Sequence, residues 1–173
     1  GTVTVAGASS WLCGSMDGSG TTVFNGTLDI AVSSCGSGVI MTNGRTMRIV
    51  NSATFTGASG FGIQSGSTLI VESGGTFDIS EDAPIVGGTI SNQGTFIKSG
   101  GSGTAQVTAQ FTNTGTVKVD SGTLYLSGGG SSSGVFALAP STVLTLNGTH
   151  TITGGATMSG TGTLEVAGGT TTI

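Results

Sequence analysis

SNQGTF, at residues 91–96, recurs as TNTGTV at residues 112–117. A second pattern repeats around it, in which Gly-Thr is followed by alternating apolar and polar residues: GTLDI at 26–30, GTFDI at 75–79 and GTLEV at 162–166. Alternation with a period of two, bounded by Gly and Ser, is typical of short strands with one buried face. Recurrence at a nearly fixed interval predicts a solenoid, in which each strand pairs with its counterpart one coil later.

The composition agrees with a β fold and excludes an ordinary helical domain. Of the 173 residues, 34 are Gly, 30 are Thr and 23 are Ser, so three small residue types supply half of the chain. The 4 basic and 8 acidic residues are few, whereas a disordered Gly- and Ser-rich chain is normally charged or Pro-rich. The net charge of -4 offers no basic surface for nucleic acid, and no apolar run approaches the roughly 18 residues of a membrane span. We predict one all-β domain, residues 1–173, with no cofactor, no nucleic-acid partner and no direct membrane insertion.

The architecture that we predict is a single-stranded, right-handed parallel β-helix, with the handedness taken from the general rule for parallel crossovers. Coils of about 18 to 24 residues give about eight coils and a rod of roughly 40 Å at the ~4.8 Å strand spacing. An antiparallel sandwich is the alternative, but it explains no sequence offset. The segment GGGSSSG at residues 128–134 is interpreted as a loop on one coil rather than a domain boundary. The predicted core consists of Val3, Val5, Phe24, Leu28, Ile30, Ile49, Phe55, Leu69, Val71, Phe77, Ile79, Ile90, Phe96, Val117, Val119, Leu124, Leu126, Phe136, Leu144, Leu146, Ile152, Leu164 and Val166.

The two cysteines are spaced by about one coil. Cys13 and Cys35 would therefore occupy equivalent positions on neighbouring rungs, about 4.8 Å from each other. That separation suits a disulfide, which would contribute on the order of 3 kcal/mol and indicate an oxidising, extracellular compartment. A pair of stacked, reduced thiols is the alternative.

Several polar residues share a position in the repeat. Glu72, Lys98 and Asp120 follow the apolar residue of three similar Ser-Gly turns, and we expect either charges that alternate along one edge of the rod or plain solvated turns. Asn92 and Asn113 predict either an internal ladder of amide side chains or ordinary turn chemistry.

Catalytic chemistry has little support in the sequence. His150 alternates with small or apolar neighbours and is expected to be an exposed strand residue rather than a general base. Three acids lie close together in sequence: Asp78, Glu81 and Asp82. They could form a hydrolytic pair or a weak Ca²⁺ site, because carboxylate oxygens suit that cation. A solvated loop leading into Pro84 is the simpler interpretation, and we predict no catalytic centre.

Ligand-binding surfaces are also weakly marked. Trp11 and Tyr125 are the only Trp and Tyr, and they lie far apart, so no aromatic platform for carbohydrate is evident. Thr-x-Thr begins at eight positions without a constant coil-sized interval, so we expect no single regular Thr face of the kind found in ice-binding proteins.

Two stretches carry a family resemblance. FTNTGTVKVDSGTL at residues 111–124 and GTGTLEV at 160–166 resemble the repeats of filamentous-haemagglutinin-like adhesins and autotransporter passenger stalks. The resemblance implies a secreted, non-catalytic β-solenoid at the cell surface, acting as a stalk, an adhesin segment or a fibre subunit, with host or surface glycans as candidate partners. The cysteines depart from that pattern. The alternative functions are a polysaccharide-active enzyme and an ice-binding module.

The two ends of the chain look like repeat sequence. Residues 1–5, GTVTV, and 168–173, GGTTTI, are strand-competent and have neither charged side chains nor Pro, the usual means of blunting a strand edge. We expect that a secretion signal was removed or lies outside this stretch, and that the chain either was cut from a longer solenoid or pairs head to tail with copies of itself. The residues expected at the end-to-end contact are Thr2, Val3, Val5, Thr170, Thr172 and Ile173.

Overall fold

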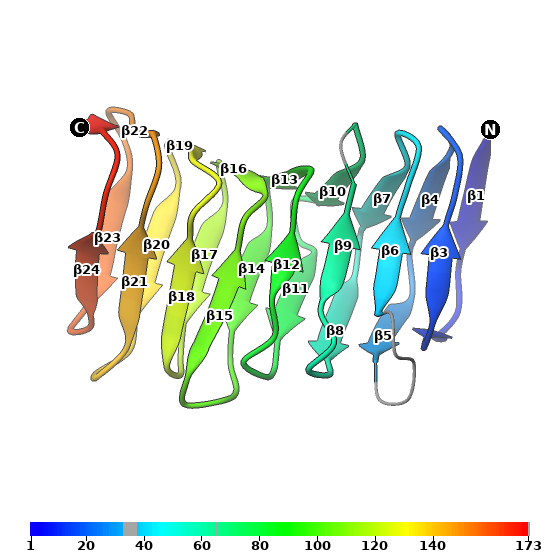
Figure 1. Cartoon of the computed structure of the whole chain (residues 1–173), viewed down its shortest axis with the longest axis horizontal. Helices are drawn as coiled ribbons and strands as arrows, with labels where there is room; N and C mark the ends of the chain where they lie inside the picture. Colours follow the sequence, from blue (N-terminus) through cyan, green and yellow to red (C-terminus); the bar gives the residue numbers. More distant parts are fainter. Residues whose placement is uncertain (33–37, 65, 173) are drawn as a thin grey trace.

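The computed structural model describes residues 1–32, 38–64 and 66–172 and contains only strands and turns there. Three parallel sheets stack as a β-solenoid of about eight coils, which confirms the predicted fold. Figure 1 shows the coils side by side, with the N-terminus at one end of the rod and the C-terminus at the other. In the described residues there is no helix long and apolar enough to cross a membrane.

Each coil contributes one strand to each sheet. Sheet A has nine strands, and sheets B and C have eight each. Sheet A consists of β1 (Thr2–Val5), β4 (Thr21–Phe24), β7 (Thr46–Ile49), β10 (Thr68–Val71), β13 (Thr89–Asn92), β16 (Gln110–Asn113), β19 (Gly130–Ser132), β22 (His150–Ile152) and β25 (Thr171–Thr172). Sheet B consists of β2 (Ser9–Trp11), β5 (Thr27–Ala31), β8 (Ser52–Thr56), β11 (Thr76–Ile79), β14 (Thr95–Lys98), β17 (Thr116–Val119), β20 (Val135–Leu138) and β23 (Thr157–Gly160). Sheet C consists of β3 (Gly14–Met16), β6 (Val39–Met41), β9 (Phe61–Ile63), β12 (Ile85–Val86), β15 (Thr104–Val107), β18 (Thr123–Leu126), β21 (Val143–Leu146) and β24 (Thr163–Val166).

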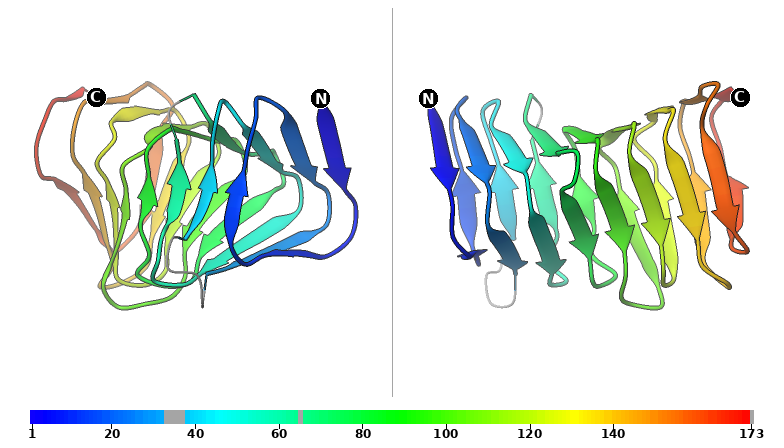
Figure 2. Two further views of the ribbon diagram at one scale, coloured as in Figure 1. Left: turned by 45° about the vertical axis from the view of Figure 1, so that its right-hand side comes forward. Right: turned by 180° about the vertical axis from the view of Figure 1, so that it is seen from behind.

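The coil is right-handed, and its length varies. In Figure 1 the strands of sheet C run upward in front, the chain returns downward behind, and successive coils advance from the N-terminal to the C-terminal end. Figure 2 shows the same stack from two further sides. Thr2 pairs with Thr21, and Thr21 pairs with Thr46. The coil from Thr21 to Thr46 is therefore longer than the coil from Thr2 to Thr21. The turns between the strands accommodate these differences in coil length, so the paired strands stay in register.

The core is a continuous column of inward side chains. Along most strands, buried and partly exposed residues alternate, as expected when one face of a strand packs inside the coil. The predicted core residues are buried except toward the two ends of the rod: Val3 and Val166 are exposed, and Val5, Ile152 and Leu164 are partly buried. Val3 and Val166 are exposed because their strands, β1 and β24, each pair with a neighbouring strand on one side only.

Aromatic rings follow one another along this core from Trp11 to Phe111. The ring of Trp11 meets that of Phe61 edge-on at 5.7 Å, and Phe61 is followed by Phe77, Phe96 and Phe111 at centroid distances of 5.0 to 6.3 Å. Offset and edge-to-face arrangements at these distances stabilise aromatic pairs beyond their burial. Trp11 itself is only 7% exposed although it lies on the first coil, so its ring is buried in the core against Phe61.

The glycine-rich segment at residues 128–134 contains a strand and is not a loop, so our interpretation of it was wrong. Residues 130–132 form β19, which pairs with β16 on one side and β22 on the other. A Cβ on Gly130 would lie 1.9 Å from the carbonyl oxygen of Phe111, and one on Gly128 would lie 2.1 Å from that of Ala109. The glycines are present because the neighbouring backbone approaches too closely for any side chain.

An internal amide ladder forms, as one of the two interpretations of the asparagines predicted. Asn92, Asn113 and Ser132 are in register and buried inside sheet A. The Nδ2 of Asn92 donates to Oδ1 of Asn113 at 2.8 Å, and Nδ2 of Asn113 donates to Oγ of Ser132 at 3.0 Å. Nδ2 of Asn92 also donates to the carbonyl oxygen of Thr116 at 2.9 Å. The ladder ties three successive coils together.

Asn113→Ala is expected to destabilise the protein by about 2 kcal/mol, because it opens a small cavity and removes two buried hydrogen bonds at once. Urea unfolding followed by circular dichroism measures the effect. Asn25→Ala is the matched control, because Asn25 is exposed at a turn and its loss should change stability by less than about 0.5 kcal/mol. Equal effects of the two substitutions would contradict the ladder.

Glu72, Lys98 and Asp120 do not form an edge of alternating charges, the first of the two interpretations given above. Lys98 pairs in register with Ile79 and Val119, so it points into the core and its side chain is fully buried. Glu72 instead accepts a hydrogen bond from Nε of Arg48 at 2.6 Å, across a different corner of the coil. The alignment of the Ser-Gly turns in the sequence places Lys98 opposite Asp120. In the structure Lys98 pairs with Val119, which is one residue earlier. A slip of one residue reverses which face a side chain occupies.

Candidate functional site

The three acids singled out in the sequence have separate partners. Oδ2 of Asp78 accepts a hydrogen bond from Oγ of Ser99 at 2.8 Å, and Oε2 of Glu81 accepts one from the backbone N of Gly57 at 3.2 Å. Asp82 instead accepts a hydrogen bond from the buried ammonium group of Lys98. In the part of the chain that the structure describes, no three His, Cys, Asp or Glu side chains converge in a way that could hold a metal ion. The structure therefore does not bring Asp78, Glu81 and Asp82 together into one site.

The partner of Asp82 is Lys98, at the corner between sheets B and C. Nζ of Lys98 donates to Oδ1 of Asp82 at 2.8 Å and also to the carbonyl oxygens of Gly100 and Gly101. Oδ2 of Asp82 accepts from the backbone N of Gly103 at 2.8 Å. The hydrogen bond from Lys98 holds the pKa of Asp82 below its ordinary value, against a smaller effect of desolvation. These hydrogen bonds hold the turn that follows β14 against the turn that follows β11 on the preceding coil.

A second polar cluster, which the sequence did not reveal, joins the first two coils. Oδ1 of Asp17 accepts from Oγ1 of Thr42 at 2.6 Å, from Nδ2 of Asn43 at 2.5 Å and from the backbone N of Gly18 at 2.7 Å. These hydrogen bonds, with that from Thr42 the largest, lower the pKa of Asp17. Nη1 of Arg45 lies 3.4 Å from the Asp17 carbonyl oxygen and donates to it. The cluster is therefore structural in character, because it connects the first coil to the second through hydrogen bonds to Asp17.

His150 is buried, contrary to expectation. Its ring points inward from β22, where it is in register with Gly130 and Thr171. Nε2 lies 3.0 Å from the carbonyl oxygen of Asn147 and 3.3 Å from that of Leu126, so Nε2 carries the hydrogen and donates. Gly130 leaves room for the ring on the adjacent coil. His150 thus closes hydrogen bonds within the core.

Threonines form a ladder on sheet A that their uneven sequence spacing had hidden. Thr2, Thr21, Thr46, Thr68 and Thr89 are in register on five successive coils. The neighbouring outward column is mixed: Thr4, Val23, Arg48, Ile70 and Ser91. The threonines therefore form a single column on these five coils, and no two-column Thr-x-Thr array is formed there.

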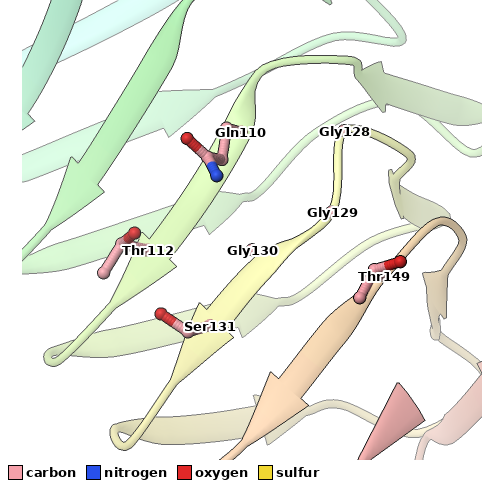
Figure 3. Close-up of a pocket in the computed structure, with 7 residues that line it drawn as sticks. All are labelled: Gln110, Thr112, Gly128, Gly129, Gly130, Ser131 and Thr149. Carbon is pink, nitrogen blue, oxygen red and sulfur yellow. The ribbon is translucent and has the colours of Figure 1, made fainter. Parts of the chain in front are cut away.

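A polar notch interrupts the outer face of sheet A beside β19. It has a volume of about 460 Å³ and is lined by Gln110, Thr112, Gly128, Gly129, Gly130, Ser131 and Thr149. Figure 3 shows the side chains of Gln110, Thr112, Ser131 and Thr149 around the bare glycine backbone. All of these residues are uncharged, and together they present hydroxyl, amide and peptide groups. Such a lining suits a neutral, hydroxyl-bearing ligand.

The C-terminal rung leaves the core uncovered. Met158 on β23 and Val166 on β24 are 48% and 51% exposed. An apolar cavity of about 180 Å³ opens there, lined by Phe136, Leu146, Ile152, Ala156, Thr157, Met158, Leu164, Val166 and Thr171. At the other end Trp11 is 7% exposed, while Val3 on β1 is 57% exposed. Of the residues expected at the ends, Thr2, Val3 and Val5 lie on β1 and Thr172 lies on β25, Thr170 directly precedes β25, and Ile173 lies outside the described residues.

The cysteine pairing stays a prediction, because Cys35 lies outside the described residues. Cys13 is not a free thiol. Gly14, the residue after Cys13, pairs with Val39, so this coil is longer than the spacing of the two cysteines. That spacing therefore does not by itself place Cys13 and Cys35 at equivalent positions.

The intact mass of the untreated protein is expected to be two hydrogen masses below that of the reduced chain, if Cys13 and Cys35 are joined. Mass spectrometry with and without reductant measures this difference. Alkylation without denaturant serves as the control and should modify neither residue. Two thiols that react freely in the native protein would refute the bridge.

Comparison with known proteins leaves the fold without an assigned family. A scan against protein-family models, a search of the curated proteins and a search of the solved structures find no match to this chain. The resemblance to adhesin repeats thus rests on residues 111–124 and 160–166 alone. Function has to be inferred from the geometry.

Proposed function

We propose that this chain is a non-catalytic, extracellular structural rod, a segment of a stalk or fibre whose terminal rungs stack on further coils of the same cross-section. The observation that carries the proposal is the state of the two ends. Both terminal rungs present strand edges on three sheets, and the C-terminal rung leaves an apolar cavity open. Uncovered edges of this kind recruit further strands.

The body of the rod supports the same role. Three hydrogen-bonded sheets run along it in parallel, and about eight coils at ~4.8 Å give a length of roughly 40 Å. Buried groups that span neighbouring coils, such as the Asn92–Asn113–Ser132 ladder and the Asp82–Lys98 pair, fix the register rather than form a reaction centre. An extracellular location is supported by Cys13, which is not a free thiol, and by the adhesin-like repeats.

The test is self-association of the chain in sedimentation velocity. The wild type is expected to form larger species as its concentration rises, and Val166→Lys should weaken this association at least about tenfold by placing a charge on the open rung. Val86→Lys is the matched control, because Val86 is equally exposed, at 51%, but lies on the side of the rod. Equal weakening by both lysines, or a wild type that stays monomeric at its highest soluble concentration, would contradict the proposal.

A second candidate function is glycan binding at the polar notch, which its neutral hydrogen-bonding lining favours. Calorimetric titration with a panel of neutral oligosaccharides tests this function. Binding should be lost in Gln110→Ala and retained in Gln106→Ala, since Gln106 is also exposed but lies on sheet C. Binding that survives both substitutions, or is absent from the wild type, would exclude the notch as the site.

A further inference from the structure

One strand of sheet C contains a glycine that its backbone does not require. Among the described residues, four strands contain a glycine: β3 at Gly14, β9 at Gly62, β19 at Gly130 and β23 at Gly160. The glycines of β3, β19 and β23 have φ angles of +82°, +142° and +95°, which other residues adopt only with strain. The φ of Gly62 is not positive, and the nearest atoms to a Cβ on it belong to the side chain of Ile40, at ordinary contact distances of 3.4 to 3.7 Å. A larger residue would therefore fit at this position.

A glycine inside a strand is unfavourable when the backbone does not require it. It loses more conformational freedom on folding than any other residue, and it packs no side chain against its neighbours. Such a glycine often marks a position where a ligand or another backbone approaches closely. In the described part of the chain, the space over Gly62 is an open cavity on the outer face of β9. The glycine thus lowers stability and keeps this face open.

The open space over Gly62 is a slot with apolar walls, which we call the β9 slot. Ile40 on β6 and Val86 on β12 are in register with Gly62 on its two sides, and Val86 is 51% exposed. Figure 1 shows these three strands side by side on the near face of the rod. Two cavities, of about 510 and 180 Å³, both include these three residues, so they form one slot along β9. All the residues that line it are uncharged.

The width of the β9 slot suits a planar ring. Its walls stand two coils apart, so the Cα atoms of Ile40 and Val86 are separated by about 9.6 Å at the ~4.8 Å strand spacing. The branched side chains narrow this gap. A flat ring needs carbon contacts of about 3.5 to 4.0 Å on each face, which is about 7 to 8 Å between the walls. A saturated ring is puckered and thicker, so it would have to push the walls apart.

One end of the β9 slot carries a polar group. Gln64 is exposed there, directly after β9, and its amide can donate to or accept from a hydroxyl group. Asn43 also lines this end, but its Nδ2 already donates to Oδ1 of Asp17. A charged ligand would lose hydration in the slot without gaining a charged partner from its lining. The lining therefore favours a neutral ring with a hydroxyl group at one end.

We propose that the β9 slot binds a neutral, planar phenolic compound. The ring lies between Ile40 and Val86 with one edge on the backbone of Gly62, and its hydroxyl group lies at Gln64. The slot is on the side of the rod, so this inference goes beyond the proposed function and does not depend on what covers the two ends. A rod that fails to stack would still bind the ring.

Titration with 4-methylphenol, followed by the amide resonances in NMR spectra, tests the site. In the wild type, amides of β6, β9 and β12 are expected to shift in a saturable way. Gly62→Val should weaken binding at least about tenfold, because the new side chain occupies the slot. Ala137→Val is the matched control, since Ala137 is also partly exposed inside a strand but lies on β20 in sheet B. Its binding should equal that of the wild type.

Stability distinguishes a glycine kept for binding from a structural one. Gly62→Ala is expected to unfold at the same urea concentration as the wild type or at a higher one, because alanine has less freedom to lose and its Cβ is accommodated. If Gly62→Ala is less stable than the wild type, the glycine is structural and the proposal fails.

A saturated analogue tests the shape of the slot. 4-Methylcyclohexanol carries the same substituents on a puckered ring and should bind at least about tenfold more weakly than 4-methylphenol. Equal binding of the two compounds, binding that survives Gly62→Val, or a wild type without saturable shifts up to the solubility limit of the phenol would each overturn the proposal.

Discussion

Gly130→Ala is expected to destabilise the protein by about 4 kcal/mol, enough to leave a marginally stable chain largely unfolded. The added Cβ would lie 1.9 Å from the carbonyl oxygen of Phe111 and 2.6 Å from its carbonyl carbon. Those atoms belong to the adjacent strand β16, so relief requires that the strands separate. The φ angle of Gly130 is +142°, which an alanine adopts only with strain.

Gly154→Ala is the matched control for this substitution. No atom lies within 4 Å of a Cβ on Gly154, and its φ is not positive, so stability should change by less than about 0.5 kcal/mol. Urea unfolding followed by circular dichroism compares the two variants. If they unfold at the same urea concentration, β19 does not pair closely with β16 and the segment is the loop that its composition suggested.

The repeat made most of the fold predictable because strand pairing follows directly from it. Once residues 91–96 and 112–117 are aligned, Asn92 falls on Asn113, and both the parallel register and the amide ladder follow. The predicted core was correct inside the rod because inward positions recur with a period of two along each strand. It was wrong only on the terminal rungs, where Val3 and Val166 have a coil on one side alone.

The candidate sites were less predictable because they depend on coil length, which varies. Lys98 was assigned to the wrong face since the turn motif aligns it with Asp120, while the strand pairs it with Val119. Thr2, Thr21 and Thr46 seemed unrelated since the intervals between them differ, yet they stand in one column. His150 looked exposed because its neighbours are small, but the space for its ring comes from Gly130 on another coil.

Asp82→Ala is expected to cost about 3 kcal/mol, the second large effect. The substitution leaves the ammonium group of Lys98, which is fully buried, without its counter-ion, and removal of one partner from a buried pair is strongly destabilising. The value lies at the low end of the range for such pairs because the Asp82 side chain is 38% exposed and the carbonyl oxygens of Gly100 and Gly101 remain. Urea unfolding at neutral pH measures the loss.

Asp120→Ala is the matched control, because Asp120 also pairs with a lysine, Lys118, at 3.1 Å, but both side chains are 40% exposed. Such a surface pair contributes roughly 0 to 1 kcal/mol. The double variant Lys98→Met with Asp82→Asn should recover most of the stability lost in Asp82→Ala, since it removes the buried charge and keeps an acceptor for Gly103. Equal losses in Asp82→Ala and Asp120→Ala would show that Lys98 does not depend on its partner.

The acid dependence of stability provides an independent check on the same pair. Since the pKa of Asp82 is lowered in the folded protein, its carboxylate contributes stability that is fully present above the unfolded-state pKa of about 3.9. That contribution is lost as the pH falls through the folded pKa, so wild-type stability should decline below about pH 4. Asp82→Asn removes the titrating group, and its stability should fall less steeply over that window, with the remaining slope shared by Asp17, whose pKa is also lowered. If the stability of Asp82→Asn falls with pH as steeply as that of the wild type, the Lys98 hydrogen bond does not distinguish the charged from the protonated form of Asp82. The corner between sheets B and C would then be held by the backbone alone.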